Sequence, residues 1–328
     1  MIDLPLLQPA SLARSASQRN HTDRGPDASL EVVLVRPCTR VLLAHRGSLL
    51  VARGHLVRFA VDDSAGLTGT RIYLGKDAQD TDFIGIDLDD EARAEVDRRI
   101  AGDLDTDAEP QLEDPATGID VSVPTWLNLR DVGLSLDDLD VGLACELVAL
   151  GNWHRAHTHS PRNGLPTEVV AGGWVRREPT TGSEHFPRTD PAVIMAVVHT
   201  DPDGTERILL GNNALWPDHR FSLLAGFVEP GETLERAVIR EVHEEVGVVC
   251  HSPKYLGSQP WPFPCSLMLG FVAEAESRDT DVDVEEISHA RWFTREELRS
   301  ELAAGTIWVP GTVSIAGQIL EAWLGADR

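Results

Sequence analysis

The sequence predicts an α/β protein of the α+β kind with two domains. The chain has 328 residues, which is enough for two compact domains with ordinary cores. Hydrophobic residues make up 42% of it and charged residues 25%, the proportions of a soluble globular protein. Short apolar runs between turn residues, which are typical of strands, occur in both halves, and so do apolar residues at helical spacing.

The N-terminal half has the pattern of a small sheet. Residues 1–28 are polar, and we expect them to form a flexible arm. Strands are predicted at residues 31–35, 41–44, 48–51, 70–74 and 82–86. Helices are predicted over 89–100 and over 136–154, where leucines recur at helical spacing and the helix ends near Gly151. We therefore expect a smaller, β-rich N-terminal domain over 29–150.

The C-terminal half follows a segment at 151–189 that is rich in Gly, Pro, Thr and His, and this segment is predicted to be a connector. A strand over 192–199, a turn at Asp201–Gly204 and a strand over 207–211 form a predicted hairpin. The hairpin leads into the residues that carry the chemistry, so we expect the second domain over 190–328.

Charge and composition argue against several classes of protein. The net charge of -24 speaks against a broad electrostatic footprint on nucleic acid, but it is compatible with a local basic site. The chain has no apolar run of about 18 residues and no signal-peptide layout at its start, so we expect a cytoplasmic protein without a membrane partner. The four cysteines are scattered, and they indicate neither a disulfide framework nor a cysteine zinc site.

The segment Gly226–Val248, with the sequence GFVEPGETLERAVIREVHEEVGV, carries acidic residues at fixed spacing. A helix is predicted over 233–246, led by Pro230 and closed by Gly247, which suits the left-handed position after a helix end. One face of this helix would carry Val238, Ile239, Val242 and Val246, and another would carry Glu241, Glu244 and Glu245.

Carboxylates within one helical turn repel one another, and a divalent cation removes that cost. Mg²⁺ binds hard oxygen ligands and keeps several waters, so two carboxylates and a substrate phosphate make a natural site for it. Arg240 can hold either Glu244 or Glu232 by a charge-assisted hydrogen bond. The alternative interpretation is an ordinary acidic surface helix.

This segment resembles the Nudix box, whose pattern G-x5-E-x7-R-E-U-x-E-E-x-G-U, with U aliphatic, it matches at every fixed position. The resemblance implies a sandwich of helices around a mixed sheet, and hydrolysis of a nucleoside diphosphate linked to a further group. It also implies that Glu241, Glu245 and the backbone carbonyl of Ala225 bind Mg²⁺ or Mn²⁺. Glu244 would be a ligand or a base, and Arg240 and Glu232 complete the expected catalytic set.

A second segment, Ser258–Ser266, has the sequence SQPWPFPCS. Its alternating prolines fix φ and remove amide donors, which predicts a stiff extended wall from which Trp261 and Phe263 project. Such a wall suits a pocket for a planar ring. A rigid structural loop that packs its own aromatic side chains explains the pattern equally well.

The second segment is similar to the signature of the NADH pyrophosphatase branch of the Nudix family, whose members also remove NAD caps from RNA. Further matches lie between residues 184 and 314, whereas residues 1–130 match weakly. The resemblance places Gln259, Pro260, Trp261, Pro262, Phe263, Pro264, Cys265 and Ser266 around the nicotinamide mononucleotide half of the substrate. Phe186 and Phe227 would sandwich the ring. Glu286 would be a third metal carboxylate near the substrate, which Ser314 would also contact.

Members of this branch often carry a four-cysteine zinc ribbon where this chain has its connector. The matching positions here hold Ser160, Asn163, Glu178 and Thr181. None of them is a thiolate, and structural zinc needs Cys or His, so we expect the connector to resemble a zinc ribbon without its zinc. A substitute site made of His154, His157, His159 and His185 stays an open alternative.

The predicted activity is hydrolysis of NADH or NAD⁺ to nicotinamide mononucleotide and AMP, with the same chemistry on NAD-capped RNA as an extension. Two alternatives stay open: hydrolysis of another nucleoside diphosphate derivative such as ADP-ribose, and an NAD(H)-sensing module without turnover. The family resemblance also implies a homodimer.

Overall fold

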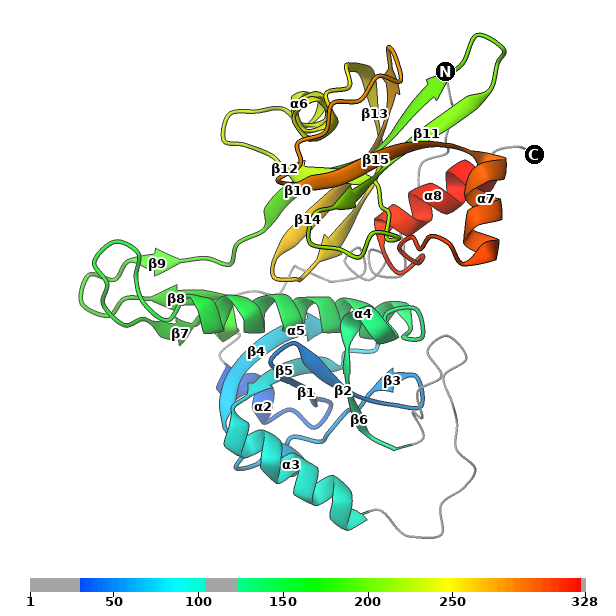
Figure 1. Ribbon diagram of the computed structural model, residues 1–328. Coiled ribbons are helices and arrows are strands. Elements are labelled where there is room, and N and C mark those ends of the chain that lie inside the picture. Colours follow the sequence, from blue (N-terminus) through cyan, green and yellow to red (C-terminus); the bar gives the residue numbers. More distant parts are fainter. Residues whose placement is uncertain (1–29, 104–122, 326–328) are drawn as a thin grey trace. The chain divides into compact units, whose positions relative to one another are not determined.

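The computed structural model describes residues 30–103 and 123–325 (Figure 1), so the predicted N-terminal arm lies outside the described residues. The chain divides into two compact units. Of the described residues, one unit contains Asp190–Pro260 and 266–325. The other contains 30–103, 123–189 and Trp261–Cys265. Within the described residues, no helix combines the length and the apolar character needed to cross a membrane.

The N-terminal unit is built on a six-stranded sheet with the order β3-β2-β1-β5-β4, and β6 also pairs with β2. Its strands are β1 (Arg40–His45), β2 (Ser48–Ala52), β3 (His55–Leu56), β4 (Gly69–Lys76), β5 (Asp82–Leu88) and β6 (Thr125–Asn128). Its helical segments are α2 (Leu30–Leu34), η3 (Asp62–Ser64), α3 (Asp90–Asp103), α4 (Leu129–Val132) and α5 (Asp138–Ala156). Four of the five strands predicted in this half are confirmed, and so are both helices.

Helices cover both faces of this sheet. Alternate residues of β1 and β5, among them Val41 and Ile86, pack with Val96 of α3. On the other face, α5 lies so close to β5 that a side chain at Gly85 would collide with Leu147. The N-terminal sheet is therefore buried between helices, as Figure 1 shows for α3 and α5.

Two predictions in this unit are wrong in detail. Residues 31–34 belong to the short helix α2, not to a strand, and Val35 lies in the turn that follows. A short apolar run fits either structure, and here Val33 packs with Tyr73 and Ile84. Helix α5 does not end at Gly151 but continues to Ala156. A Cβ at Gly151 would lie 3.0 Å from the carboxylate of Asp87, so a larger residue there would have to displace this carboxylate slightly.

The predicted connector contains a small sheet of its own. Three strands with the order β7-β8-β9 form it, namely β7 (Glu168–Val170), β8 (Val175–Arg177) and β9 (Glu184–His185), with the short helix η4 (Ala171–Gly173) between the first two. Both pairings in this sheet are antiparallel.

The C-terminal unit is a mixed sheet with the order β13-β14-β10-β11-β15, to which β12 adds by pairing with β10. The strands are β10 (Asp190–Thr200), β11 (Glu206–Asn213), β12 (Leu224–Phe227), β13 (Cys250–Trp261), β14 (Ser266–Ala275) and β15 (Ile287–Thr294). Its helices are α6 (Leu234–Val246), α7 (Arg295–Ala304) and α8 (Ile315–Gly325). β10 pairs with β14 in parallel and with β11 in the predicted antiparallel hairpin.

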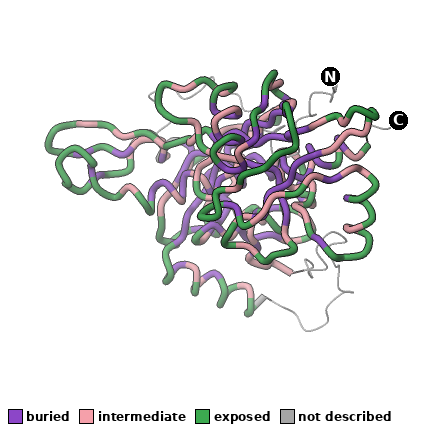
Figure 2. Tube along the Cα trace, turned by 45° about the horizontal axis from the view of Figure 1, so that its top comes forward, coloured by how far each residue is buried: buried purple, intermediate pink, exposed green. Residues whose placement is uncertain are grey.

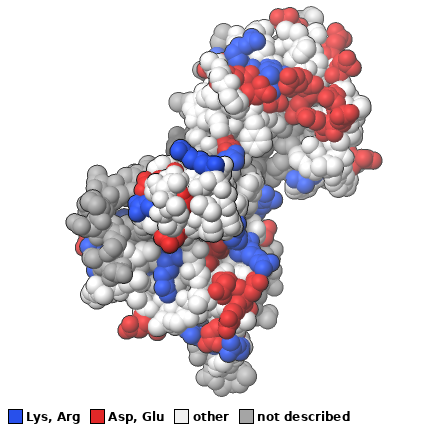
Figure 3. Space-filling view, turned by 90° about the vertical axis from the view of Figure 1, so that its left-hand side faces the viewer, with Lys and Arg blue, Asp and Glu red and all other residues white. Residues whose placement is uncertain are grey.

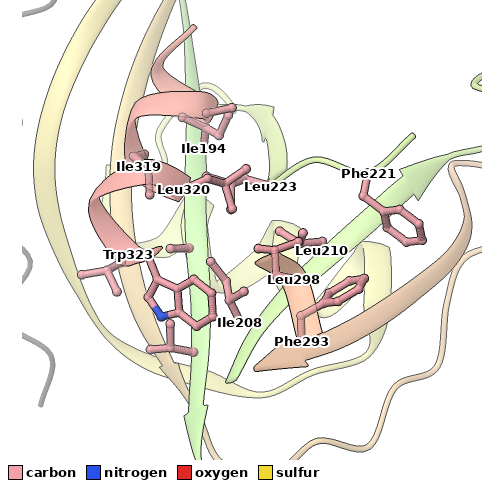
Figure 4. Packing of buried hydrophobic residues seen from close by; sticks show 14 of the residues in the cluster. Ile194, Ile208, Leu210, Phe221, Leu223, Phe293, Leu298, Ile319, Leu320 and Trp323 are labelled. Atoms are coloured by element: carbon pink, nitrogen blue, oxygen red, sulfur yellow. The ribbon is translucent and has the colours of Figure 1, made fainter. Parts of the chain in front are cut away.

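Strand β10 divides the core of this unit into two layers. Val193, Met195 and Val197 belong to the layer of α6, whereas Ile194, Ala196 and Val198 belong to the layer of α7 and α8. Figure 4 shows the second layer, in which Ile319, Leu320 and Trp323 of α8 pack on the sheet. Burying a large apolar side chain in this way contributes about 1.5–3 kcal/mol. The buried segments in Figure 2 follow the strands, and the expected sandwich of helices around a mixed sheet is confirmed.

Candidate active site

Helix α6 forms where its capping residues predict it. The side chain of Thr233 caps the first turn by accepting a hydrogen bond from the amide of Arg236 at 3.3 Å. Gly247 ends the helix in the left-handed conformation with φ 69°. Val238, Val242 and Val246 are fully buried against the sheet, so the packing face of the predicted helix is confirmed.

The three helix glutamates do not share one environment. Glu241 and Glu245 are buried, whereas 59% of the Glu244 side chain is exposed. Residues one turn apart lie in one stripe, while Glu244 is rotated by about 100° from Glu245. The predicted single carboxylate face is therefore split into an inner pair and one outer glutamate.

Strand β12 brings the start of the segment against this inner pair. Ala225 and Gly226 pair with Ile194 and Val193 of β10. A Cβ at position 226 would lie 1.9 Å from Cδ of Glu241. Only glycine at 226 lets the Glu241 carboxylate rest on the strand, next to Ala225, whose carbonyl is a predicted metal ligand.

Arg240 connects the strand, the loop and the helix. Its Nε and Nη2 donate to the two carboxylate oxygens of Glu232, each at 2.9 Å, and Nη2 also donates to the carbonyl of Phe227 at 2.9 Å. Its Nη1 donates to Glu241 and Glu244, again at 2.9 Å. Arg240 therefore holds both of the glutamates that the sequence offered as alternatives, and its hydrogen bond lowers the pKa of Glu232.

Glu245 is the most unusual ionisable group of this site. Its Oε2 is buried and has no hydrogen-bond partner in the described structure. Burial raises its pKa to about 8, and the neighbouring charges of Glu241 and Glu286 add to this effect. Burial also raises the pKa of Glu241, against the opposing hydrogen bond from Arg240. Two buried carboxylates and Glu286 therefore lie close enough to repel one another.

A hard divalent cation fits this set of donors. All of them are oxygens, the ligand type of Mg²⁺ and Mn²⁺, and the unpaired Oε2 of Glu245 is a buried acceptor that a cation would satisfy. Acidic side chains also gather on the face of the C-terminal unit drawn in Figure 3.

The only group of three potential ligand residues with atoms within 4.8 Å of one another, among the described residues, is His55, Asp137 and Asp140. There Asp140 already accepts hydrogen bonds from Arg58 at 2.6 Å and from the amide of Leu56 at 3.0 Å, so its charge is balanced without an ion. We interpret this second group as structural.

The model of the NUDIX domain family matches residues 190–309. This part of the chain is a NUDIX domain. The match begins where the C-terminal unit begins, and it contains α6 and every glutamate described above. We call residues 190–309 the Nudix domain from here on.

The Nudix domain and its flanks are similar to proteins of one branch. NAD-capped RNA hydrolase NudC of Mycobacterium bovis (strain BCG) is 45% identical over 210 residues, which are 61% of this chain and 66% of that protein. Human NAD-capped RNA hydrolase NUDT12 is 41% identical over 202 residues, which are 58% of this chain and 43% of that protein. The matched part thus spans slightly less than two thirds of the mycobacterial relative, and the predicted resemblance is confirmed.

Solved structures of Nudix domains are also similar to the chain. That of Shewanella oneidensis NrtR with ADP ribose is 17% identical, with a TM-score of 0.35 over 44% of this chain and 90% of that one.

The SQPWPFPCS segment differs from the predicted extended wall. β13 ends at Trp261, residues 262–265 form a turn, and β14 begins at Ser266. The rings of Trp261 and Phe263 meet edge to face at 5.1 Å, and the guanidinium of Arg130 lies 4.2 Å from the Phe263 ring centroid. The prolines stiffen a turn between paired strands, in which the aromatic side chains pack on each other as in the second interpretation.

The N-terminal unit holds this turn in place through residues that the sequence did not single out. The side chain of Asn152 donates to the carbonyl of Pro262 at 2.9 Å, and Arg130 stacks on Phe263. Pro262 is buried, Pro264 is exposed, and Pro260, Cys265 and Ser266 are half-buried. Asn152 lies at the start of the predicted connector, but no local pattern marks a partner so far along the chain.

The side chain of Gln259 forms hydrogen bonds inside the C-terminal unit. It is 1% exposed, its Nε2 donates to the carbonyl of Val313 at 2.9 Å, and its Oε1 accepts from the amide of Ile315 at 2.7 Å. Ser314 lies between these two partners and donates to the carbonyl of Gly311 at 2.9 Å. Gln259 thus ties the end of β13 to the first turn of α8.

The two phenylalanines predicted to sandwich a ring are both exposed. Phe227, at the end of β12, is 60% exposed, and Phe186, which follows β9 in the N-terminal unit, is 62% exposed. Large apolar side chains with this exposure are free to contact a ligand.

The connector positions that match zinc cysteines are joined by hydrogen bonds. The buried carboxylate of Glu178 accepts from Asn163 Nδ2 at 3.2 Å and from the amides of Thr180 and Thr181 at 2.6 and 2.9 Å. Ser160 accepts from the amide of Arg162 at 3.3 Å. Without thiolates, this set does not fit structural zinc.

The connector histidines do not gather either. His154 contacts the carbonyl of Gly173 at 2.8 Å and Arg176 at 3.2 Å, and His157 contacts the carbonyl of Trp153 at 3.0 Å. In the described parts of the chain they form no group of three ligands with His159 or His185.

Proposed function

We propose that the chain hydrolyses the pyrophosphate bond of NADH or NAD⁺ to nicotinamide mononucleotide and AMP, and removes NAD caps from RNA by the same reaction. The observation that carries the proposal is the buried carboxylate of Glu245, whose Oε2 has no hydrogen-bond partner among the described residues. It lies on α6 with Glu241 and is close enough to Glu286 to feel its charge. The names of the relatives support the substrate, because both are called NAD-capped RNA hydrolases.

Glu241, Glu245 and Glu286, with the carbonyl of Ala225, would hold Mg²⁺ or Mn²⁺. A divalent cation supplies neutralisation of phosphoryl charge and a water that is more readily deprotonated. Arg240 donates one hydrogen bond from Nη1 to Glu241 and another from Nε to Glu232. These bonds orient both carboxylates before the substrate binds.

Glu244 keeps contact with solvent while Arg240 holds it. We assign it the role of base that takes a proton from the attacking water, because an exposed carboxylate can pass that proton on to solvent.

Aromatic side chains would bind the nicotinamide end. Phe227 follows Gly226 in β12 and has an exposed side chain, and Arg240 of the carboxylate site holds its backbone carbonyl. A planar ring stacks favourably on such a side chain. Phe186, Ser314 and the residues 259–266 complete the proposed substrate contacts.

A homodimer and a cytoplasmic location belong to the same proposal, and both rest on the family resemblance. Sedimentation of the purified chain at micromolar concentration tests the first, with twice the mass of 35.8 kDa as the expected result.

The decisive experiment compares NADH, ADP-ribose and NAD-capped RNA as substrates of the purified protein with millimolar Mg²⁺, in oxygen-18 water. We expect nicotinamide mononucleotide and AMP from NADH, with the heavy isotope in only one of the two phosphates. A preference for ADP-ribose over NADH contradicts the substrate assignment. Tight NADH binding without cleavage would instead identify a sensing module.

A further inference from the structure

Three side chains of the Nudix domain, Trp216, Arg220 and Trp308, form a stack in which the arginine lies between two indoles. The guanidinium carbon of Arg220 is 4.1 Å from the ring centroid of Trp216 and 4.8 Å from that of Trp308. We call this group the tryptophan–arginine stack. None of its members belongs to the carboxylate site or to the SQPWPFPCS turn.

The backbone around the stack is held by a dense set of hydrogen bonds. Trp308 bonds to the chain on both sides of Arg220, because its amide donates to His219 and its carbonyl accepts from Phe221, both at 2.8 Å. The buried side chain of Asn212 donates to the carbonyls of Pro217 and Arg220 at 2.8 and 2.6 Å. The stack is therefore pre-organised, so a ligand would not need to order it.

Among the described residues, Arg220 has no charged partner. Its Nε is buried without a hydrogen-bond acceptor, and in the described ranges no carboxylate lies within 4.0 Å of its guanidinium. Five other arginines of the domain form ion pairs, among them Arg240 with three glutamates and Arg291 with Glu301 at 2.7 Å; the others are Arg207, Arg278 and Arg295. In a chain with a net charge of -24, an unpaired and partly buried cation is an exception that an anionic ligand would explain.

The stack is joined to the carboxylate site through its loops. The loop that carries Trp216 and Arg220 starts at the end of β11, where the amide of Ala214 donates to the carbonyl of Glu286 at 2.8 Å. Trp308 begins the segment that runs on to Ser314, a predicted substrate contact. The start of the loop that carries Trp216 and Arg220 is therefore held against the backbone of Glu286, a proposed metal ligand.

We propose that the tryptophan–arginine stack binds a nucleotide of the RNA chain that follows an NAD cap, with a phosphate at Arg220 and a base against Trp308. This inference rests on the proposed function. The two indoles hold the guanidinium of Arg220 in place, and guanidinium N–H groups are strong donors to phosphate oxygens. Trp308 is 48% exposed, and bases of any sequence stack on such side chains, as in other proteins that bind single strands.

The test compares kcat/KM for NADH and for a short NAD-capped oligonucleotide in the wild type and in the variants Arg220→Lys and Trp308→Ala. We expect each variant to lower kcat/KM for the capped oligonucleotide about tenfold, mainly through KM, because one stacked base or phosphate contact is lost. The value for NADH should change less than twofold. An equal loss on both substrates, or no loss on the oligonucleotide, overturns the inference.

A matched control is available in the N-terminal unit, where the guanidinium of Arg93 lies 4.2 Å from the ring centroid of Trp126 and also pairs with Asp97 at 3.0 Å. Arg93→Lys should leave both substrates unaffected. If Trp308→Ala fails to fold, Trp308→Phe keeps a ring, and it should retain most of the activity on the capped oligonucleotide.

The inference and the proposed function can fail separately. If the wild type cleaves neither substrate, the proposed function fails. The dissociation constant of a fluorescent NAD-capped oligonucleotide, measured by anisotropy, then still tests whether the tryptophan–arginine stack binds the RNA chain. We expect weaker binding by Arg220→Lys, and unchanged binding overturns the inference.

Discussion

Gly226 and the carboxylate of Glu241 are in direct contact, since a Cβ at position 226 would lie 1.9 Å from Cδ of Glu241. We predict that Gly226→Ala pushes this carboxylate aside and lowers kcat at least a hundredfold, at a cost of about 1–3 kcal/mol in stability. Steady-state kinetics and urea denaturation measure both effects. Gly102→Ala in α3, where the added methyl would meet open space, is the control, and equal kinetics for the two variants would refute the prediction.

The second prediction concerns Glu245. Glu245→Gln removes the charge but not the volume, so we expect turnover to fall by several orders of magnitude while the fold remains. Single-turnover assays and circular dichroism check these outcomes. Near-normal turnover, or an unfolded variant, contradicts the proposed role.

Glu245 also predicts a pH dependence of the metal-free protein. Its pKa is raised to about 8 in the folded chain, so the folded state favours the protonated carboxyl. The resulting stabilisation is complete below the unfolded pKa and is lost as the pH rises through about 8. In the presence of a chelator, the difference in urea midpoint between wild type and Glu245→Gln should therefore change between pH 5 and pH 8. A difference in urea midpoint that stays constant between pH 5 and pH 8 would contradict this prediction.

Arg240 provides the third prediction. A lysine has no fork of N–H groups and cannot bind Glu232, Glu241, Glu244 and the Phe227 carbonyl together. Arg240→Lys should lower kcat about 10–100-fold and cost about 1.5–3 kcal/mol of stability. Arg236→Lys changes an exposed arginine on the same helix and should alter neither quantity. Similar losses in both variants would show a general helix effect instead.

Glu178 provides the fourth prediction, in the connector. Hydrogen bonds, first from the side chain of Thr181, lower the pKa of Glu178 to about 2. A lowered carboxyl pKa stabilises the fold above the unfolded value, and this contribution is lost as the pH falls toward 2. Glu178→Gln should therefore lower Tm at pH 7 and have a smaller effect at pH 3. Glu168→Gln, at an exposed position of the same small sheet, should leave Tm unchanged at both pH values.

Metal content is the fifth prediction. Because the connector offers no thiolate, we expect the purified chain to contain far less than one zinc per molecule by mass spectrometry. A chelator should abolish hydrolysis, and Mg²⁺ or Mn²⁺ should restore the activity. One zinc per molecule that resists dialysis would contradict this prediction and would indicate a site made of the connector histidines.

Local sequence signals were sufficient for the core of the site. Thr233 and Gly247 define the ends of α6 by capping chemistry that depends on near neighbours, and the valine stripe defines its buried face. Glu244 and Glu245 have different environments because they are separated by the helical angle, so the sequence alone could have predicted the difference. The contact of Gly226 with Glu241 could not be predicted in this way, because it depends on how β12 pairs with β10.

Other features needed the fold itself. Residues 31–34 belong to a helix in which Val33 packs with Tyr73 and Ile84, and a short apolar pattern cannot reveal this packing. Trp308 reaches Arg220 only because the loop before α8 runs beside the loop after β11. No spacing in the sequence marks such a pair.

The hydrogen bonds between Gln259 and the start of α8 restrict how the substrate specificity can be redesigned. Both ends of the Gln259 amide are occupied, so randomising the whole SQPWPFPCS turn would mix loss of folding with change of specificity. Libraries that keep this glutamine and vary only the aromatic positions after it would report on recognition alone.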